Sequence, residues 1–376
     1  MDRETVFKIL EKLIAINTAN PPGNEKAAAE YLYELFCEEK ISARIQDLGN
    51  NRANLTASYG NGEPEIIFCG HLDVVPAAED WQFPPFQMIK KGERLYGRGT
   101  ADMKGGVAAM CAVLLQLSRE NIRLSGTLTL VLVADEECGN LGMRHFLREK
   151  GKAAFAVIGE PTELQVAVAH RGVLRDYVDI AAAPYHAALP LQQHNAMQDA
   201  AKAINAIFRM NEALVQYRHA LLPPPGIAVT MVEGYEKDNI VPGHVRLLTD
   251  FRVLPGMGYE ECRRLEEQAL EGIENCSLSK HFFMPGGEMD SGHALVKKCC
   301  EIGERVLGEP QSPAAFDASC EQCFLVGHGI PAVICGPGSL KQAHTSEEYV
   351  EEEQIRLAVK YYYQIAMEFL KGEESK

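Results

Sequence analysis

The most constraining feature of this chain is that several apolar runs end in histidine or acidic residues. Three runs show this pattern: residues 66–69 are followed by His71 and Asp73, residues 128–134 by Asp135, Glu136 and Glu137, and residues 155–159 by Glu160. Each run has the length of a buried strand, and helical patterns lie between them. Strands alternating with helices indicate a mostly parallel α/β sheet. The carboxyl ends of such strands share one edge, so these side chains are predicted to converge there.

Two further residues complete the candidate site. Asp102 lies in a glycine-rich segment, residues 97–106, and His344 lies far downstream. Two imidazoles and three carboxylates form the ligand set of a two-metal hydrolytic centre. Glu136 is an additional carboxylate, left free beside a ligand to act as a general base. An acidic triplet at the end of a buried strand is costly unless cations or donors pair it, which favours a site over a solvated loop.

Length and composition restrict the class of protein. The 376 residues are enough for two domains, and 46% hydrophobic with 24% charged residues is typical of a globular chain. The formal net charge of −15 disfavours nucleic acid or an anionic membrane surface as a partner. We see no signal-peptide pattern at the N-terminus and no apolar run long enough for a membrane span.

The eleven cysteines are scattered and mostly lie in apolar runs. Reduced, buried thiols are therefore predicted, together with a cytoplasmic location. Cys320 and Cys323 form a lone C-x-x-C, which could be redox-active or half of a zinc site. Because no second pair completes a four-thiolate site, structural thiols are the favoured interpretation.

The pattern of elements changes after residue 174. The following segments are predicted in order: strand 176–182, helix 195–218, strands 226–233 and 245–254, helix 260–273 and strand 276–283. This β-α-β-β-α-β order is typical of a small two-layer domain. We therefore predict a catalytic α/β domain made of residues 1–174 and 289–376, with a mixed, mostly parallel sheet flanked by helices. A lid domain is predicted to be inserted at residues 175–288.

The chain also carries motifs that resemble those of one known family. They are G-H-L-D-V-V-P at 70–76, G-R-G-x-x-D-M-K-G-G at 97–106, D-E-E-x-G at 135–139, G-E-P-T at 159–162, and G-P-G at 336–338 before A-H-T-x-x-E-Y at 343–349. In order and over nearly the whole chain, they are similar to motifs of the two-zinc peptidases and deacylases. That family includes acetylornithine deacetylase, succinyl-diaminopimelate desuccinylase, aminoacylase and glutamate carboxypeptidase.

The resemblance implies a role for each residue of the candidate site. His71 and Glu160 would hold one metal, Glu137 and His344 would hold the other, and Asp102 would bridge both. The mixture of imidazole and carboxylate ligands suits two zinc ions, with manganese or cobalt as alternatives.

Three further features follow from the same resemblance. Asp73 would orient the imidazole of His71, and Glu136 would be the general base. The peptide bond between Asp102 and Met103 would be cis.

The inserted segment resembles the lid of this family, which implies a homodimer formed through that domain. His186 matches a lid histidine that steadies the oxyanion and, in dimeric relatives, reaches the partner's active site. Asn239 and Arg252 match the family's grip on a substrate carboxylate. The backbone amides of Gly336 and Gly338 would assist in that planar recognition.

The predicted activity is hydrolysis of the amide bond of an N-acyl amino acid, or of a related small substrate with a free carboxylate. Water between the two cations would lose a proton to Glu136 and attack the carbonyl, and His186 would stabilise the oxyanion. Cleavage of small peptides by a dipeptidase or carboxypeptidase is the alternative.

Two other classes are considered. A non-catalytic metal- or metabolite-binding protein could keep the fold, but it would lack a ligand or the base. A thiol redox protein using Cys320 and Cys323 would leave the carboxylate cluster unexplained.

Overall fold

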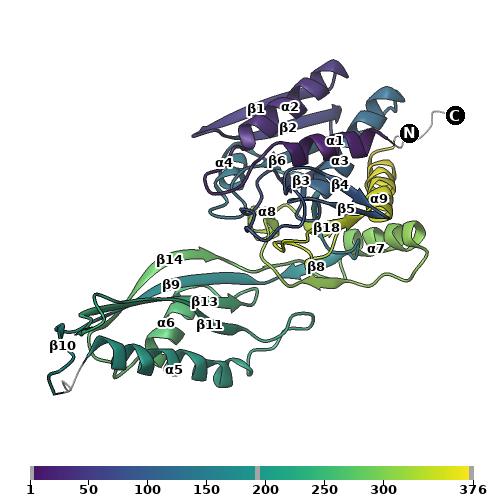
Figure 1. Cartoon of the computed structure of the whole chain (residues 1–376). Coiled ribbons are helices and arrows are strands. Elements are labelled where there is room, and N and C mark those ends of the chain that lie inside the picture. The colour runs from purple at the N-terminus through teal and green to yellow at the C-terminus, as the bar shows by residue number, and fades with distance from the viewer. Residues whose placement is uncertain (1–3, 191–194, 372–376) are drawn as a thin grey trace. The chain divides into compact units, whose positions relative to one another are not determined.

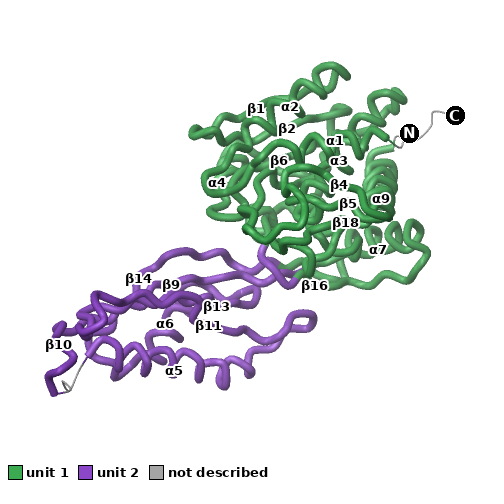
Figure 2. The backbone as a smooth tube through the Cα atoms, viewed as in Figure 1, with its two compact units in different colours: residues 1–168, 288–316, 320–376 green, residues 169–287, 317–319 purple. Residues whose placement is uncertain are grey.

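The computed structural model describes residues 4–190 and 195–371, which divide into two compact units (Figure 2). Unit 1 comprises Met1–Val168, Glu288–Phe316 and Cys320–Lys376. Unit 2 comprises Ala169–Gly287 and Asp317–Ser319. The inserted domain predicted from the sequence, residues 175–288, stays a prediction about function. Among the described residues, no helix is both long and apolar enough to cross a membrane.

Unit 1 is built on a nine-stranded mixed sheet (Figure 1). In spatial order the path is β1 (Ser42–Gly49), β2 (Arg52–Gly60), β6 (Thr127–Val133), β3 (Glu65–His71), β7 (Phe155–Pro161), β17 (Ala332–Gly336), β8 (Ala167–His170) and β15 (Gly287–Glu288), with β16 (Ala314–Phe316) beside β8. The four central strands, from β6 to β17, pair in parallel. The flanking pairs β1–β2, β2–β6 and β17–β8 are antiparallel. These findings confirm the predicted mixed, mostly parallel sheet, whose parallel pairs lie at its centre.

Helices flank this sheet, as predicted. They are α1 (Thr5–Ala15), α2 (Glu25–Glu38), α3 (Lys104–Arg119), α4 (Leu141–Glu149), α7 (Ala294–Leu307), α8 (Gln322–Gly327) and α9 (Glu352–Leu370). Helix α3 contacts β3, β6 and β7, with α1 and α9 beside it. A side chain at Gly106 would bring its Cβ within 2.3 Å of the Gly159 carbonyl oxygen in β7. The glycine therefore lets the start of α3, next to Asp102, approach the sheet closely.

A small three-stranded sheet in unit 1 joins two distant parts of the chain. It consists of β4 (Ile89–Lys91), β5 (Arg94–Tyr96) and β18 (Tyr349–Glu351). Strand β18 pairs antiparallel with β5, and Tyr349 lies opposite Tyr96. This pairing places the segment after His344 beside the segment before Asp102. The sequence pattern does not predict it, because each strand has only three residues.

Unit 2 has two layers, a four-stranded antiparallel sheet and two helices (Figure 1). The sheet order is β11 (Gly226–Glu233), β13 (His244–Val253), β9 (Gly172–Ala181) and β14 (Cys276–Met284), and the helices are α5 (Ala196–Leu214) and α6 (Tyr259–Ala269). A separate pair, β10 (Tyr185–His186) with β12 (Ile240–Val241), was not predicted. The β-α-β-β-α-β order of the long elements confirms the predicted fold class, although both helices end about one turn earlier than expected.

Candidate metal centre

The parallel strands bring the predicted side chains to one edge of the sheet in unit 1. His71 is the last residue of β3 and pairs with Val133, the last residue of β6. The acidic triplet 135–137 begins two residues beyond Val133, and Glu160 lies near the end of β7. All of these strands point in the same direction, so their carboxyl ends meet. The sheet thus gathers the histidine and the carboxylates that follow the three apolar runs.

The first half of the site is centred on His71. Its Nε2 lies 3.1 Å from Oδ1 of Asp102 and 3.6 Å from Oε1 of Glu160. Its Nδ1 lies 2.9 Å from the backbone carbonyl oxygen of Asp73. A hydrogen bond donated from Nδ1 to that carbonyl leaves the Nε2 lone pair free for a cation. The Asp73 carboxylate is 3.7 Å from Nδ1, so Asp73 orients the ring through its backbone and not through its side chain.

The second half of the site is centred on His344. Its Nε2 lies 3.3 Å from Oδ2 of Asp102 and 3.2 Å from Oε2 of Glu137. The two oxygens of Asp102 therefore face two different imidazoles, as expected of a carboxylate shared between two cations. The His344 side chain is 51% exposed and that of Asp102 only 9%, so the His344 half is the one open to solvent.

The donor set fits divalent metal ions. Ligand atoms of His71, Asp102 and Glu137 all lie within 4.8 Å of one another. Oε1 of Glu137 is buried and has no hydrogen-bond partner among the described residues. A buried, unpaired carboxylate oxygen beside two imidazoles is the chemistry that a zinc-like cation satisfies. The Asp102–Met103 peptide bond is cis, as the resemblance implies.

The electrostatics of the site also favour bound cations. Hydrogen bonds to Asp102 and Glu137 raise the pKa of His344 to about 10. Burial alone would raise the pKa of Asp102, but hydrogen bonds from the two imidazoles hold it below its usual value. Burial, together with the charge of Asp102, raises the pKa of Glu160 well above its ordinary range. A metal competes with protons for these same lone pairs, so cations would replace the protons of the site.

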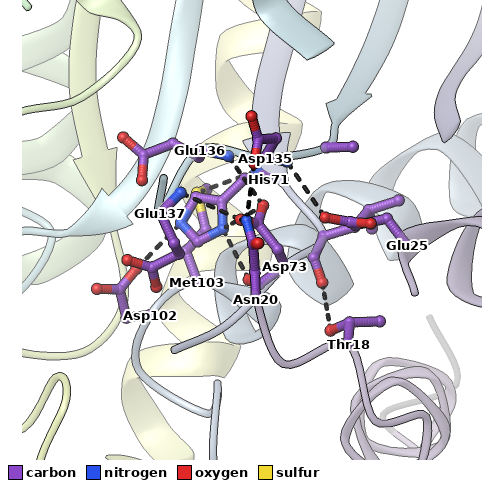
Figure 3. Close-up of polar contacts among 12 residues, drawn as sticks. Thr18, Asn20, Glu25, His71, Asp73, Asp102, Met103, Asp135, Glu136 and Glu137 are labelled. Carbon is purple, nitrogen blue, oxygen red and sulfur yellow. Dashed lines mark hydrogen bonds and ion pairs between the residues drawn. The ribbon is translucent and has the colours of Figure 1, made fainter. Parts of the chain in front are cut away.

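The Asp73 carboxylate holds the acidic triplet in place (Figure 3). Its Oδ1 accepts the backbone N–H of Glu136 and its Oδ2 that of Glu137, both at 3.1 Å. The side chain of Asn20 donates to Oδ2 of Asp73 at 2.8 Å. Burial and the nearby charge of Glu321 raise the pKa of Glu136 well above its ordinary value. Glu136 is thus a positioned carboxylate with a strong affinity for a proton, which suits a general base.

Glu348 is a residue of this region to which the sequence motifs assign no role. Its Oε1 accepts backbone N–H groups of Gly99, Ala101 and Asp102 at 2.9–3.1 Å. Its Oε2 accepts from Nη1 of Arg98 at 2.6 Å, and both side chains are buried. The motif A-H-T-x-x-E-Y includes Glu348 and so pointed to this residue, but it did not indicate which groups Glu348 binds.

The three candidate residues of unit 2 do not form one cluster. Asn239 precedes β12, and its side-chain amide nitrogen lies 3.3 Å from Nε2 of His186 in β10. Arg252 lies near the end of β13, opposite Val173, whereas the first residue of β13, His244, lies opposite Ala181. Arg252 and the Asn239 pair are therefore at opposite ends of β9, about 25 Å apart at the rise of a strand. Asn239 and Arg252 of one chain are therefore separated, and their shared grip on a substrate carboxylate stays a prediction.

The glycines expected to bind the same carboxylate are engaged elsewhere. The backbone N–H of Gly336 donates to Oγ1 of Thr162 at 3.2 Å. The N–H of Gly338 donates to the side-chain oxygen of Gln354 at 2.6 Å. Neither N–H is free to donate to a substrate oxygen without breaking its present bond, and the role of these glycines in binding a carboxylate stays a prediction.

The cysteine pair is structural. Cys320 and Cys323 are both buried and reduced, and the thiol of Cys323 lies 3.6 Å from the backbone oxygen of Cys320. Burial raises the pKa of both thiols well above the ordinary value. Such thiols are poor nucleophiles, which argues against the redox interpretation.

Comparisons with known proteins give a family match and curated relatives. The family described as Peptidase family M20/M25/M40 matches residues 67–368. Acetylornithine deacetylase of Pasteurella multocida (strain Pm70) is 30% identical over 316 residues, which cover 81% of this chain and 80% of that protein. Acetylornithine deacetylase of Photorhabdus laumondii subsp. laumondii is 29% identical over 334 residues, covering 86% and 84%.

Solved structures share the fold. An M20 family metallo-carboxypeptidase from Sulfolobus solfataricus has a TM-score of 0.82 at 20% identity and covers 97% of this chain and 99% of its own. Human carnosine dipeptidase 1 has a TM-score of 0.77 at 15% identity, covering 98% and 97%. At these identities the likeness is one of architecture, so it does not choose between substrates.

Proposed function

Because the chain belongs to peptidase family M20/M25/M40, as its motifs imply, we propose that this hydrolase uses two divalent metal ions to cleave N-acyl amino acids. The bond cleaved is the amide next to a free carboxylate. Two relatives are acetylornithine deacetylases, which favours acetylated amino acids among the candidate substrates. Zinc is the metal proposed, with cobalt or manganese as alternatives, because imidazole and carboxylate ligands suit all three.

One observation carries the proposal. Asp102 directs Oδ1 toward His71 and Oδ2 toward His344, so the two imidazoles share this one carboxylate, which could bridge two cations. Glu160 completes the His71 half and Glu137 the His344 half. Two cations held by these residues would polarise the scissile carbonyl and acidify the attacking water.

The chain's own residues would move the proton. Glu136 would take a proton from the attacking water and pass it to the leaving amine, acting first as base and then as acid. Its backbone N–H donates to Asp73, which fixes the segment that carries the carboxylate before substrate arrives. Burial gives Glu136 the raised pKa that such a shuttle needs.

The pair formed by His186 and Asn239 is proposed to stabilise the oxyanion. The backbone N–H of Ala188 lies 3.1 Å from Nδ1 of His186 and donates to it. Nδ1 is then unprotonated, so the neutral ring carries its proton on Nε2. Nε2 lies 3.3 Å from the amide nitrogen of Asn239, and these two donors would both point at an oxyanion bound beside them. The pair would act in the metal centre of the same chain or in that of a partner copy.

Arg252 is proposed to bind the substrate carboxylate without Asn239 of the same chain. Its Nε and Nη2 lie 2.6 Å and 3.3 Å from the carboxylate oxygens of Asp250. This pairing fixes the plane of the guanidinium and leaves Nη1 for a charge-assisted bond to substrate.

A homodimer through unit 2 is also proposed. Strand β11 is an edge of the unit 2 sheet, and Met231 and Val232 on it are exposed. Tyr235, just beyond the strand, is 89% exposed. An exposed apolar edge strand is suited to pairing with a second copy. The free cysteines of the chain fit a cytoplasmic location.

The test is a release assay for free amines on protein stripped of metal and then given zinc, manganese or cobalt. The substrates are N-acetylornithine, other N-acyl amino acids, their C-terminal amides and a set of dipeptides. We expect no turnover without metal, and fastest turnover on N-acyl amino acids with a free carboxylate. Faster turnover of dipeptides would instead support the peptidase alternative. Full activity of protein with no bound transition metal would overturn the proposal.

A further inference from the structure

A buried carboxylate beside the proposed metal centre has no assigned role. Glu321 lies directly before α8, and its side chain is fully buried. Neither of its carboxylate oxygens has a hydrogen-bond partner among the described residues. Carboxylate oxygens of Glu136, Glu160 and Glu321 all lie within 4.8 Å of one another. An acidic side chain in this state is costly unless a positive charge stands close to it.

Without a metal, a protonated His71 is the positive group that acts on Glu321, but His71 would be neutral as a metal ligand. Cys320 precedes Glu321 and Cys323 follows two residues later, and both are buried thiols. The two nearest carboxylates, Glu136 and Glu160, add negative charge. Glu160 in turn lies 3.6 Å from Nε2 of His71, where a cation is proposed to sit. A cation in the His71 half would therefore be the nearest favourable charge for Glu321.

The two halves of the centre differ in this respect. The His71 half is buried and has Glu321 beside its ligand Glu160. The His344 half is open, since the His344 side chain is 51% exposed. A charge acts more strongly over a short distance and in a site shielded from water. Any effect of Glu321 should thus fall mainly on the His71 half.

We propose that Glu321 is a positioning residue whose negative charge makes the His71–Glu160 half the tighter of the two metal sites. It acts through Glu160 and the field at the cation, and it is not itself a ligand. This inference rests on the two-metal centre of the proposed function. It also gives a reason for a charged residue between two buried cysteines, where an apolar side chain would otherwise cost less.

The experiment measures metal affinity and not turnover. His344→Ala leaves the His71 half intact, and His71→Ala leaves the His344 half intact. Glu321→Gln is introduced into each background, and the apoproteins are titrated with Co²⁺ against a chelating indicator. In the His344→Ala background we expect Glu321→Gln to weaken binding by about 10- to 100-fold. In the His71→Ala background we expect a change of less than about threefold.

Two controls separate charge from folding. Glu321→Asp keeps the charge and should recover most of the affinity in the His344→Ala background. Glu309→Gln removes a solvent-exposed charge and should change neither titration. Equal weakening in both backgrounds, or no rescue by aspartate, would overturn the inference in favour of a merely structural residue. A changed Co²⁺ absorption spectrum in the Glu321→Gln variant would show that Glu321 is a ligand, which also overturns it.

Failure of the underlying proposal would look different. If His71→Ala and His344→Ala each still bound two ions, the two-metal centre itself would be wrong. If each bound one ion but Glu321→Gln had no selective effect, only the role of Glu321 would be wrong.

Discussion

Glu348 accepts a hydrogen bond from the backbone N–H of Asp102 at 3.1 Å, although 246 residues separate the two in the sequence. Glu348 lies four residues after His344, and its segment continues into β18, which pairs with β5 just before Asp102. One buried side chain thus ties the loop of Asp102, the proposed bridging carboxylate, to the loop of His344. Because this contact already holds the two loops together, binding of cations would have to order them less.

Glu348→Gln is the first prediction. The amide oxygen can still accept the loop N–H groups, but Arg98 would be left buried and without its ionic partner. Breaking a buried ion pair in this way costs about 3–5 kcal/mol of folding stability. We expect a lower melting temperature and weaker binding of the metal between Glu137 and His344, checked by thermal unfolding and by metal titration. Glu347→Gln, at an exposed neighbouring position, is the matched control and should change neither.

Glu136→Gln is the second prediction. The amide is nearly isosteric and cannot accept the proton of the attacking water. We expect metal content to be unchanged and kcat to fall by a factor of about 10²–10⁴. Glu137→Gln is the comparison, since it should lose metal. The opposite pattern in the two variants, measured by elemental analysis and turnover, would show that their roles are exchanged.

His186→Ala is the third prediction. An oxyanion donor acts mainly in the transition state, so kcat should fall more than KM rises. If His186 serves a partner copy, mixing this variant with His71→Ala should restore activity, because some heterodimers would contain one complete site. An unchanged kcat in His186→Ala would remove the oxyanion role. Asn239→Ala should show a smaller effect of the same kind, because Asn239 contacts the Nε2 side of the ring.

The convergence of the metal ligands could be predicted from the sequence because it depends on local pattern. Apolar runs mark the central strands, and parallel strands must end at one edge, so His71, Glu137 and Glu160 had to meet there. Asp102 and His344 were candidates by residue type, and only the resemblance gave each a place in the centre. Their approach depends on the β5–β18 pairing and on Glu348, which join segments about 250 positions apart.

The rest of the site depends on distances that no pattern gives. Asn239 and Arg252 are close in sequence, yet β13 runs between them: Asn239 precedes this strand and Arg252 lies near its far end. The importance of Glu321 could not be predicted from its neighbours in the sequence. It follows from the structure, in which both oxygens of its carboxylate are buried and have no hydrogen-bond partner among the described residues.

Arg252→Leu is the fourth prediction. Loss of a charge-assisted bond of about 1.5–3 kcal/mol should raise KM for substrates with a free carboxylate by roughly ten- to a hundredfold. Their C-terminal amides should be affected much less. Arg252→Lys should recover part of the loss, since a point charge lacks the planar fork. If the unaltered protein cleaves an N-acyl amino acid and its C-terminal amide equally well, the protein does not recognise the substrate carboxylate.

The fifth prediction concerns the pH dependence of stability and rests on Glu266 in unit 2. The side chain is buried, its Oε1 accepts from Oγ1 of Thr249 at 2.8 Å, and its Oε2 has no partner among the described residues. Burial, with the charge of Asp176, raises the pKa of Glu266 from its ordinary 4.5 to about 8. The folded state therefore holds this proton more tightly than the unfolded state. The resulting stability is fully present below pH 4.5 and is lost as the pH rises through about 8.

Glu266→Gln removes this titration while keeping an acceptor for Thr249. We expect the variant to gain melting temperature relative to the unaltered protein as the pH is raised from 6 to 9, with the gain largest at the alkaline end. The matched control is Glu267→Gln, which changes an exposed carboxylate on the same helix and should track the unaltered protein. Thermal unfolding of the three proteins across this range provides the test. If the difference in melting temperature between the two variants does not change with pH, Glu266 is ionised throughout this range. Arg263, which donates to Asp176 at 2.7 Å, would then compensate the charge of Glu266 as well.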